Sequence, residues 1–99
     1  MAHVYLLLCN DGTFYVGSTS NLEARLWMHQ QGRGAEYTKD RLPVTLVWAQ
    51  EFERVVDAFA VERKLHGWSH AKKQAVVDGN WHLLPSLARS SKRKREEGT

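Results

Sequence analysis

Cysteine and proline are scarce in this chain of 99 residues, which contains one cysteine, Cys9, and two prolines. A single cysteine excludes a disulfide within the chain and any zinc site built from cysteine pairs. A lone thiol within an apolar segment is typical of a buried structural residue in a protein of the reducing cytoplasm. We therefore expect a cytoplasmic protein, associated with the nucleoid if it binds DNA.

Long apolar segments are also lacking. The longest apolar run covers residues 4–9, which is too short to span a bilayer. The N-terminus has no basic region followed by a signal-like apolar segment, so export is not expected. The composition, 42% apolar and 25% charged, is typical of a soluble globular protein, and the length suits one domain.

The net charge of +3 is not spread along the chain. Residues 89–99 contain five basic and two acidic side chains, which leaves nine of each sign in residues 1–88. The composition of residues 89–99 predicts a disordered basic tail after a domain that covers residues 1–88. Because that domain is neutral, any contact of the domain with nucleic acid must come from local placement of charge.

The N-terminal segment is typical of a β-hairpin over residues 3–17. An apolar, β-favouring run covers residues 3–9, the turn-forming sequence Asn-Asp-Gly occupies residues 10–12, and the strand pattern resumes at residues 13–16. The hairpin carries two tyrosines, Tyr5 and Tyr15.

The length of the turn decides whether the two tyrosines share a face of the sheet. A three-residue loop pairs Tyr15 with Leu7 and Gly17 with Tyr5, so that both phenols lie on one face. A two-residue turn would place them on opposite faces. A shared site for the two tyrosines therefore requires the three-residue loop.

A helix is predicted after the hairpin. Ser20 and Glu23 form a capping box at its start, and Gly32 ends it. Arg25 and His29 are four residues apart and therefore lie on one face of this helix.

The remaining pattern predicts one strand and two further helices. A loop covers residues 32–43, a strand covers residues 44–49, and a helix runs from residue 55 or 56 to residue 66. Ser69 caps a last helix that ends near residue 77, and residues 81–87 are expected to pack back onto the domain. The element order β-β-α-β-α-α predicts an α/β (α+β) fold, a small three-stranded antiparallel sheet flanked by helices.

These motifs, in this order, resemble the GIY-YIG endonuclease domain, and above all its small stand-alone bacterial members. The residues that carry the resemblance are His3-Val4-Tyr5 for the first motif, Tyr15-Val16-Gly17 for the second, Arg25 and His29 in the first helix, and Glu62 in the second. The match covers about residues 2–86, and the segments 32–38 and 67–73 also resemble the small members. The ordered set is specific, whereas each motif alone is common.

Two positions depart from the family pattern. His3 stands where the family usually has glycine, at the first residue of a strand. Ser18 follows Gly17, where some relatives carry a lysine near the phosphate. Without that lysine, part of the charge stabilisation is missing or is supplied by the loop over residues 33–41, which affects the expected rate more than the expected reaction.

The resemblance implies hydrolysis of phosphodiester bonds, which needs an activated water and neutralisation of phosphate charge. It implies that Tyr15 takes the proton of the water, while Tyr5 orients the water or shares that role. Arg25 offers a planar fork that matches phosphate oxygens. His29 orients the water or the phosphate, or shuttles a proton.

The resemblance also assigns a metal ligand, Glu62. One carboxylate with waters and phosphate oxygens suits a single divalent cation, Mg²⁺ or Mn²⁺. A site that joins Glu62 to His66 and His70 is disfavoured, because residues 67–69 interrupt the helix between the two histidines. The residues expected to contact phosphate or DNA are Gly17, Arg33, Lys39, Arg41 and Lys72.

We therefore expect a metal-dependent endonuclease that acts on DNA, with a role in DNA repair or recombination. A chain this short has no room for a separate targeting domain, so we expect weak sequence preference or a protein partner that supplies specificity. The alternative is a nucleic-acid-binding module of the same fold without efficient turnover, and a third class is a protein-interaction scaffold. The sequence leaves DNA and RNA open as substrates, since no feature reads a 2′-hydroxyl.

Overall fold

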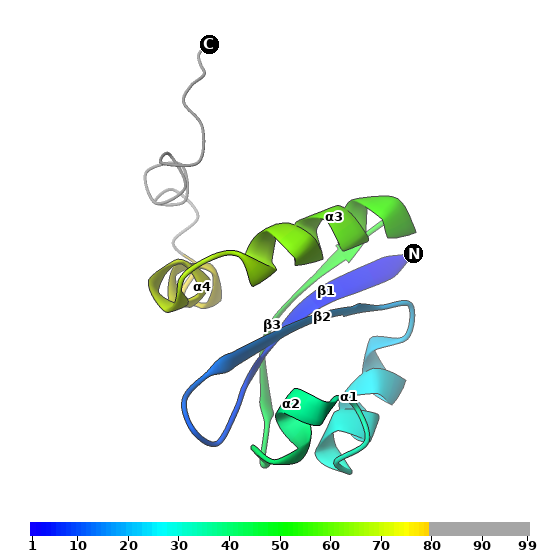
Figure 1. Cartoon of the computed structure of the whole chain (residues 1–99). Coiled ribbons are helices and arrows are strands. Elements are labelled where there is room, and N and C mark those ends of the chain that lie inside the picture. Colours follow the sequence, from blue (N-terminus) through cyan, green and yellow to red (C-terminus); the bar gives the residue numbers. More distant parts are fainter. Residues whose placement is uncertain (80–99) are drawn as a thin grey trace. The chain divides into compact units, whose positions relative to one another are not determined.

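The computed structural model describes residues 1–79 of the chain. These residues belong to two compact units, which divide after Gly67 and are described separately. The first unit, residues 1–67, contains the whole sheet. Each element of the two units is labelled in Figure 1.

The sheet of the first unit has three antiparallel strands in the order β2-β1-β3, as Figure 1 shows. The strands are β1 (Ala2–Leu8), β2 (Phe14–Thr19) and β3 (Thr45–Phe52). The central strand β1 is also the most apolar, and its residues 4–7 are all buried. A strand that is covered on both faces reads as a continuous apolar run rather than an alternating one. The predicted α+β fold with a three-stranded antiparallel sheet is confirmed.

The hairpin adopts the three-residue loop. Tyr5 pairs with Gly17 and Leu7 pairs with Tyr15, so the register that places both tyrosines on one face is confirmed. The Cys9 N–H donates to the Thr13 carbonyl at 2.8 Å and closes the loop. Gly12 has a φ of +86°, a conformation that favours glycine.

Helix α1 (Leu22–Gln30) begins one residue later than the capping box predicted. Asn21 is the N-cap, and its side-chain oxygen accepts the Ala24 N–H at 3.1 Å. The Asn21 N–H itself donates to the Thr19 hydroxyl, and this bond sets the path of the chain into the helix. Ser20 was therefore the wrong cap, because the adjacent asparagine is an equally strong N-cap and sits in the right backbone position.

A short helix, α2 (Glu36–Lys39), interrupts the loop that was predicted over residues 32–43. Four residues are too few to show a helical period in the sequence, so the prediction missed it. Thr38 of this helix is fully buried. The loop therefore contributes to the interior as well as to the surface.

Helix α3 (Val55–His66) covers the other face of the sheet, opposite α1 and α2, as Figure 1 shows. Its bounds agree with the prediction, and its residues Ala58 and Leu65 are buried. Strand β3 runs to residue 52, three residues beyond its predicted end. Side chains alternate along a strand, so the even-numbered positions of β1 and β2 face α3.

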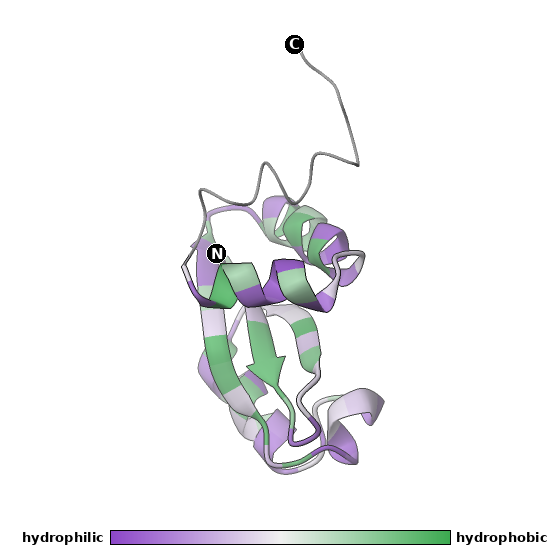
Figure 2. Cartoon of the chain, turned by 90° about the vertical axis from the view of Figure 1, so that its left-hand side faces the viewer, coloured by the Kyte–Doolittle hydropathy of each residue, from purple (hydrophilic) through white to green (hydrophobic). Residues whose placement is uncertain are grey.

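The core lies on both faces of the sheet. Hydrophobic colour in Figure 2 is concentrated on the strands, whereas the helices carry both hydrophobic and hydrophilic positions. On the α1 side, a buried cluster contains Tyr5, Leu7, Cys9 and Val44. The free thiol of Cys9 is 4% exposed, which confirms a buried cysteine.

The second unit is described from residue 68 to residue 79 and contains α4 (His70–Val77). Ser69 is its N-cap and accepts the Lys72 N–H, as predicted. The predictions for residues 81–87 and for the tail 89–99 lie outside the described residues. Within residues 1–79, no helix has the length and apolar character that crossing a membrane requires.

Candidate active site

Tyr5 and Tyr15 lie together on the α1 side of the sheet. Their ring centroids are 6.4 Å apart, and the rings are tilted by 41°. Tyr5 comes from the central strand and is 2% exposed. Tyr15 comes from the edge strand β2 and is only partly buried. The two phenols of the proposed pair therefore differ in their access to solvent.

His29 of α1 completes a buried group with the tyrosines. Its Nε2 lies 2.9 Å from the Tyr5 hydroxyl, and its Nδ1 lies 3.0 Å from the Thr38 hydroxyl. Its ring also packs edge-on to Tyr15, with 5.1 Å between centroids. Burial of His29, reinforced by the positive charge of Arg25, lowers the pKa of the imidazole below its usual value. His29 is therefore neutral at physiological pH.

Two glycines leave space for these rings. A Cβ atom at Gly17 would overlap the phenol of Tyr5, and one at Gly34 would overlap the imidazole of His29. The space beside Gly17, a residue expected to contact phosphate or DNA, is occupied by the phenol of Tyr5. Neither position can carry a larger residue unless the site side chains move.

Arg25 lies one helical turn before His29 on α1. Its Nε is buried and has no hydrogen-bond partner among the described residues. A buried N–H donor without a partner is costly, and such atoms often mark a place where a ligand completes the site. The guanidinium is therefore a donor that a bound anion can satisfy.

The two tyrosines have different acid–base properties. Burial raises the pKa of Tyr5 to about 12, although a hydrogen bond with Arg25 partly offsets this effect. Burial also raises the pKa of Tyr15, and the charge of Arg25 opposes that increase. The Tyr15 hydroxyl makes no hydrogen bond to any residue within 1–79. Tyr5 is therefore fixed as a protonated group, while Tyr15 has an unused hydroxyl.

Glu62 of α3 reaches the same end of β2 from the other side of the sheet. The Ser18 hydroxyl donates to Glu62 Oε1 at 2.7 Å, and His66 Nε2 lies 3.3 Å from Oε2. The negative charge of Glu62 raises the pKa of both Tyr5 and Tyr15, which places the carboxylate within electrostatic reach of them. Successive residues of β2 thus contact opposite halves of the site: Gly17 meets Tyr5, and Ser18 binds Glu62.

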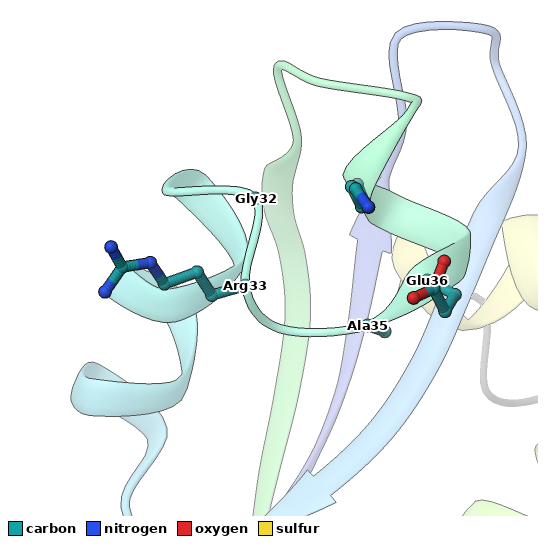
Figure 3. A pocket seen from close by; sticks show the side chains of 5 residues that line it. Gly32, Arg33, Ala35 and Glu36 are labelled. Carbon is teal, nitrogen blue, oxygen red and sulfur yellow. The ribbon is translucent and has the colours of Figure 1, made fainter.

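Of the loop residues predicted to contact phosphate, Arg33 and Lys39 line an open cavity of about 260 Å³ together with Gly32, Ala35 and Glu36. Figure 3 shows this cavity, where the Arg33 side chain extends away from Glu36. Both basic side chains are exposed. They are free to meet a ligand at the surface of the loop.

Arg41 is engaged within the protein. Its Nε donates to Asp11 at 3.0 Å and its Nη1 donates to the Tyr37 carbonyl at 2.8 Å. The guanidinium also lies 3.9 Å from the centroid of the Tyr37 ring, and that ring stacks on Tyr15 at 6.1 Å. Arg41 therefore holds Tyr37, whose ring stacks on Tyr15. Lys72 belongs to the second unit, where its ammonium lies 5.9 Å from the Trp68 ring.

Comparison with known proteins shows the family of this chain. The model of the GIY-YIG catalytic domain matches residues 1–75. This chain belongs to the GIY-YIG family. That family is a family of nucleases that bind nucleic acid, and its members generally use a divalent metal.

Similar proteins are small stand-alone GIY-YIG members called UPF0213 proteins. One from Streptococcus sanguinis is 46% identical over 76 residues, which cover 77% of this chain and 87% of the relative. One from Halobacterium salinarum is 40% identical over 76 residues, which cover 77% of this chain and 99% of the relative. The solution NMR structure of a UPF0213 protein from Bacillus halodurans has a TM-score of 0.53 and 35% identity, and covers 79% of this chain and 84% of its own.

Glu62 could bind the divalent metal that GIY-YIG nucleases generally use, but only as the single protein carboxylate of the site. Within residues 1–79, no group of three or more His, Cys, Asp or Glu side chains could enclose a metal ion. A single carboxylate suits a hard cation such as Mg²⁺, which keeps most of its water ligands. The residues therefore fit a one-carboxylate site, with Glu62 as the protein ligand.

Sequence reasoning missed three residues of the site: Gly34, Tyr37 and Thr38. All three lie in the segment 32–38, which was noted for its resemblance to the small family members and for the basic residue Arg33. The one local signal was a glycine-rich stretch followed by an aromatic and a hydroxyl residue. Nothing in that pattern indicates that the segment folds against His29 and Tyr15.

Proposed function

We propose that this protein is a metal-dependent endonuclease that hydrolyses DNA phosphodiester bonds, with branched repair or recombination intermediates among its substrates. The observation that carries the proposal is an unused hydroxyl near a guanidinium whose buried Nε lacks a hydrogen-bond partner. The Tyr15 hydroxyl has no partner within residues 1–79, and neither has the buried Nε of Arg25. Both groups lie within electrostatic reach of Glu62 or of one another.

Tyr15 is the proposed acceptor of the proton from the attacking water. It is the more exposed of the two tyrosines, and its hydroxyl is not committed to another side chain. The charge of Arg25 favours its phenolate. Tyr5 is less suited to this role, because its pKa is raised to about 12 and its hydroxyl contacts His29.

Arg25 is the proposed phosphate ligand. Its guanidinium presents several donors in one plane, a geometry that matches two oxygens of a phosphate. A phosphate bound there would give the buried Nε the acceptor that it lacks within the described residues. The same contact would neutralise charge that develops on the phosphate during hydrolysis.

Glu62 is the proposed metal ligand, held by the hydroxyl of Ser18. A divalent cation bound there would polarise the phosphate and offset the carboxylate charge that raises the pKa of Tyr15. Ser18, in the position where some relatives have lysine, contributes by orienting this carboxylate.

The test is cleavage of defined substrates by purified protein in Mg²⁺ or Mn²⁺. Branched, single-stranded and duplex DNA are compared with RNA strands of the same sequence. The variants are Tyr15→Phe and Glu62→Ala, and Glu51→Ala, an exposed carboxylate on β3, is the matched control. General acid–base groups contribute on the order of 10²- to 10⁴-fold to rates, so Tyr15→Phe should reduce kcat by that amount.

The proposal is supported when the wild type and Glu51→Ala cleave DNA equally, while both site variants still bind DNA but do not cleave it. Equal nicking by all four proteins would identify a contaminating nuclease and reject the proposal. DNA binding without cleavage by the wild type would instead favour a binding module of the same fold. Faster cleavage of the RNA strands would replace DNA with RNA as the substrate.

A further inference from the structure

A continuous line of polar contacts runs through the interior from α1 to α2. The Arg25 guanidinium interacts with the Tyr5 hydroxyl, which contacts His29 Nε2. On the other side of the imidazole, Nδ1 contacts the Thr38 hydroxyl, which contacts the Ala35 carbonyl at 3.3 Å. His29 and Thr38 are both completely buried, so water cannot replace a missing partner in this line.

The groups at the two ends of this line determine the direction in which its hydrogen bonds point. Arg25 can only donate hydrogen bonds, and the Ala35 carbonyl can only accept them. Each hydroxyl between them has one proton to donate. All groups are satisfied when Arg25 donates to Tyr5, Tyr5 donates to His29 Nε2, His29 Nδ1–H donates to Thr38, and Thr38 donates to Ala35.

The other neutral form of the histidine breaks this order. With the proton on Nε2, His29 would donate to the Tyr5 hydroxyl, whose own proton would then meet the guanidinium of Arg25. Arg25 has no acceptor for that proton. Thr38 would also have to turn its proton from Ala35 to Nδ1. The contacts at Thr38 therefore determine, through His29, whether the Tyr5 hydroxyl presents a lone pair or its proton to Arg25.

We propose that Thr38 is a positioning residue, which holds His29 in the Nδ1–H tautomer so that the Tyr5 hydroxyl presents its lone pairs to Arg25. This inference rests on the proposed function only for its effect on the reaction. Arg25 is the group that touches the phosphate, and Thr38 acts on it through His29 and Tyr5. Consecutive hydrogen bonds that point the same way polarise one another, which strengthens the hold on the guanidinium.

The direct test is the tautomer of His29, measured by two-bond ¹H–¹⁵N correlation NMR on the full chain. In the wild type we expect a protonated Nδ1 and an unprotonated, pyridine-like Nε2. Thr38→Val keeps the shape of the side chain but removes the acceptor for Nδ1–H, so the Nε2–H form should increase. Thr38→Ser keeps the hydroxyl and should retain the wild-type spectrum.

Cleavage kinetics provide the second readout. Loss of a residue that orients a catalytic group typically reduces activity by about 10- to 100-fold. Thr38→Val should reduce kcat by that amount with little change in KM, and Thr38→Ser should restore most of the rate. A general loss of structure would change the amide spectrum throughout the chain and would not be rescued by serine.

Two results would overturn the inference: an Nε2–H tautomer in the wild type, or an unchanged tautomer and unchanged kcat in Thr38→Val. The wild-type spectrum alone decides the first, even if the valine variant does not fold. Failure of the proposed function is a separate result, because it would appear as no cleavage by the wild type. In that case the NMR measurement still decides whether Thr38 fixes the tautomer.

Discussion

The two faces of the sheet are buried to a similar degree but have different chemistry. The face toward α3 is apolar, and the fully buried residues at its even-numbered positions are Val4, Leu6 and Val16. The face toward α1 and α2 buries Tyr5, His29 and Thr38 just as deeply. Polar groups are tolerated there because each has a partner in one connected line.

This difference means that the α3 face contributes to stability, whereas the other face contributes to stability and also carries the candidate site. The apolar face contributes free energy by removing hydrocarbon from water, and any side chain of the right size would serve. The face toward α1 and α2 also buries apolar side chains such as Leu7 and Val44, but its polar groups gain little from burial and depend on geometry that a single lost partner would disturb. Variants on the α3 face should therefore change stability, whereas variants on the other face should change activity as well as stability.

The largest expected effect is on the apolar face. Leu6→Ala removes a side chain that is 0% exposed and should lower the free energy of unfolding by about 2–5 kcal/mol. Leu8→Ala, at a 37% exposed position of the same strand, should lower it much less. Urea denaturation followed by circular dichroism measures both. Equal losses would mean that the burial of Leu6 does not determine its contribution to stability.

On the polar face, the reaction rate should depend on pH through Tyr15. Its pKa is raised above the ordinary value of 10.0, so the phenolate fraction grows about tenfold for each pH unit below that point. If Tyr15 is the base, kcat should rise about 100-fold between pH 7 and pH 9. A rate that becomes constant above pH 7 would assign the base to a group of lower pKa.

Stability should fall at high pH because of Tyr5. Its pKa is about 12 in the folded protein and 10.0 in the unfolded chain, so the folded state holds this proton more tightly. The contribution of this proton to the free energy of unfolding is complete below pH 10. It is lost as the pH rises to about 12, a decrease on the order of 2–3 kcal/mol. Denaturation of the wild type and Tyr5→Phe over this range measures the difference. Parallel curves for the two proteins would contradict the assignment.

A methyl group at Gly34 should disturb the polar face. Gly34→Ala would overlap the His29 ring and should cost about 1–3 kcal/mol as the packing adjusts. Gly67→Ala is the matched control, because its Cβ would lie 3.6 Å from its nearest neighbour, the Lys64 carbonyl. Thermal denaturation compares the two variants. If Gly34→Ala is as stable as Gly67→Ala, the His29 ring is not tightly packed against the loop that contains Gly34.

The smallest effect is expected at Tyr37, which stacks on Tyr15. An aromatic pair is worth about 0.5–1.5 kcal/mol, so Tyr37→Ala should reduce kcat by about tenfold or less. Tyr37→Phe keeps the ring and should keep the rate. Steady-state cleavage of one DNA substrate gives both values. If the phenylalanine variant loses as much activity as the alanine variant, the hydroxyl rather than the stacking is important.

Most of the fold and part of the site could be predicted from the sequence. The Asn10-Asp11-Gly12 sequence predicted a hairpin and left two registers open, and the three-residue loop that forms brings Tyr5 and Tyr15 together. Helical spacing placed Arg25 and His29 on one face, because a regular helix keeps residues four apart adjacent. These predictions succeeded because short-range geometry decides them.

The contacts of the segment 32–38 could not be predicted in the same way. Thr38 and Tyr37 reach His29 and Tyr15 only because the loop folds back as a four-residue helix. No sequence period encodes such a short turn, and its position depends on what it packs against. The wrong N-cap at Ser20 has a similar origin, since two adjacent residues could cap α1 and only the incoming strand decides between them.

Gly34 and His29 should also be linked in evolution. The imidazole of His29 occupies the space where a Cβ atom of residue 34 would lie, so each residue limits which side chain the other position can carry. A relative with a side chain at the position of Gly34 is expected to have lost the histidine or to have moved the loop. When relatives are chosen for activity tests, the presence of both Gly34 and His29 is therefore a useful criterion, although the glycine itself takes no part in the reaction.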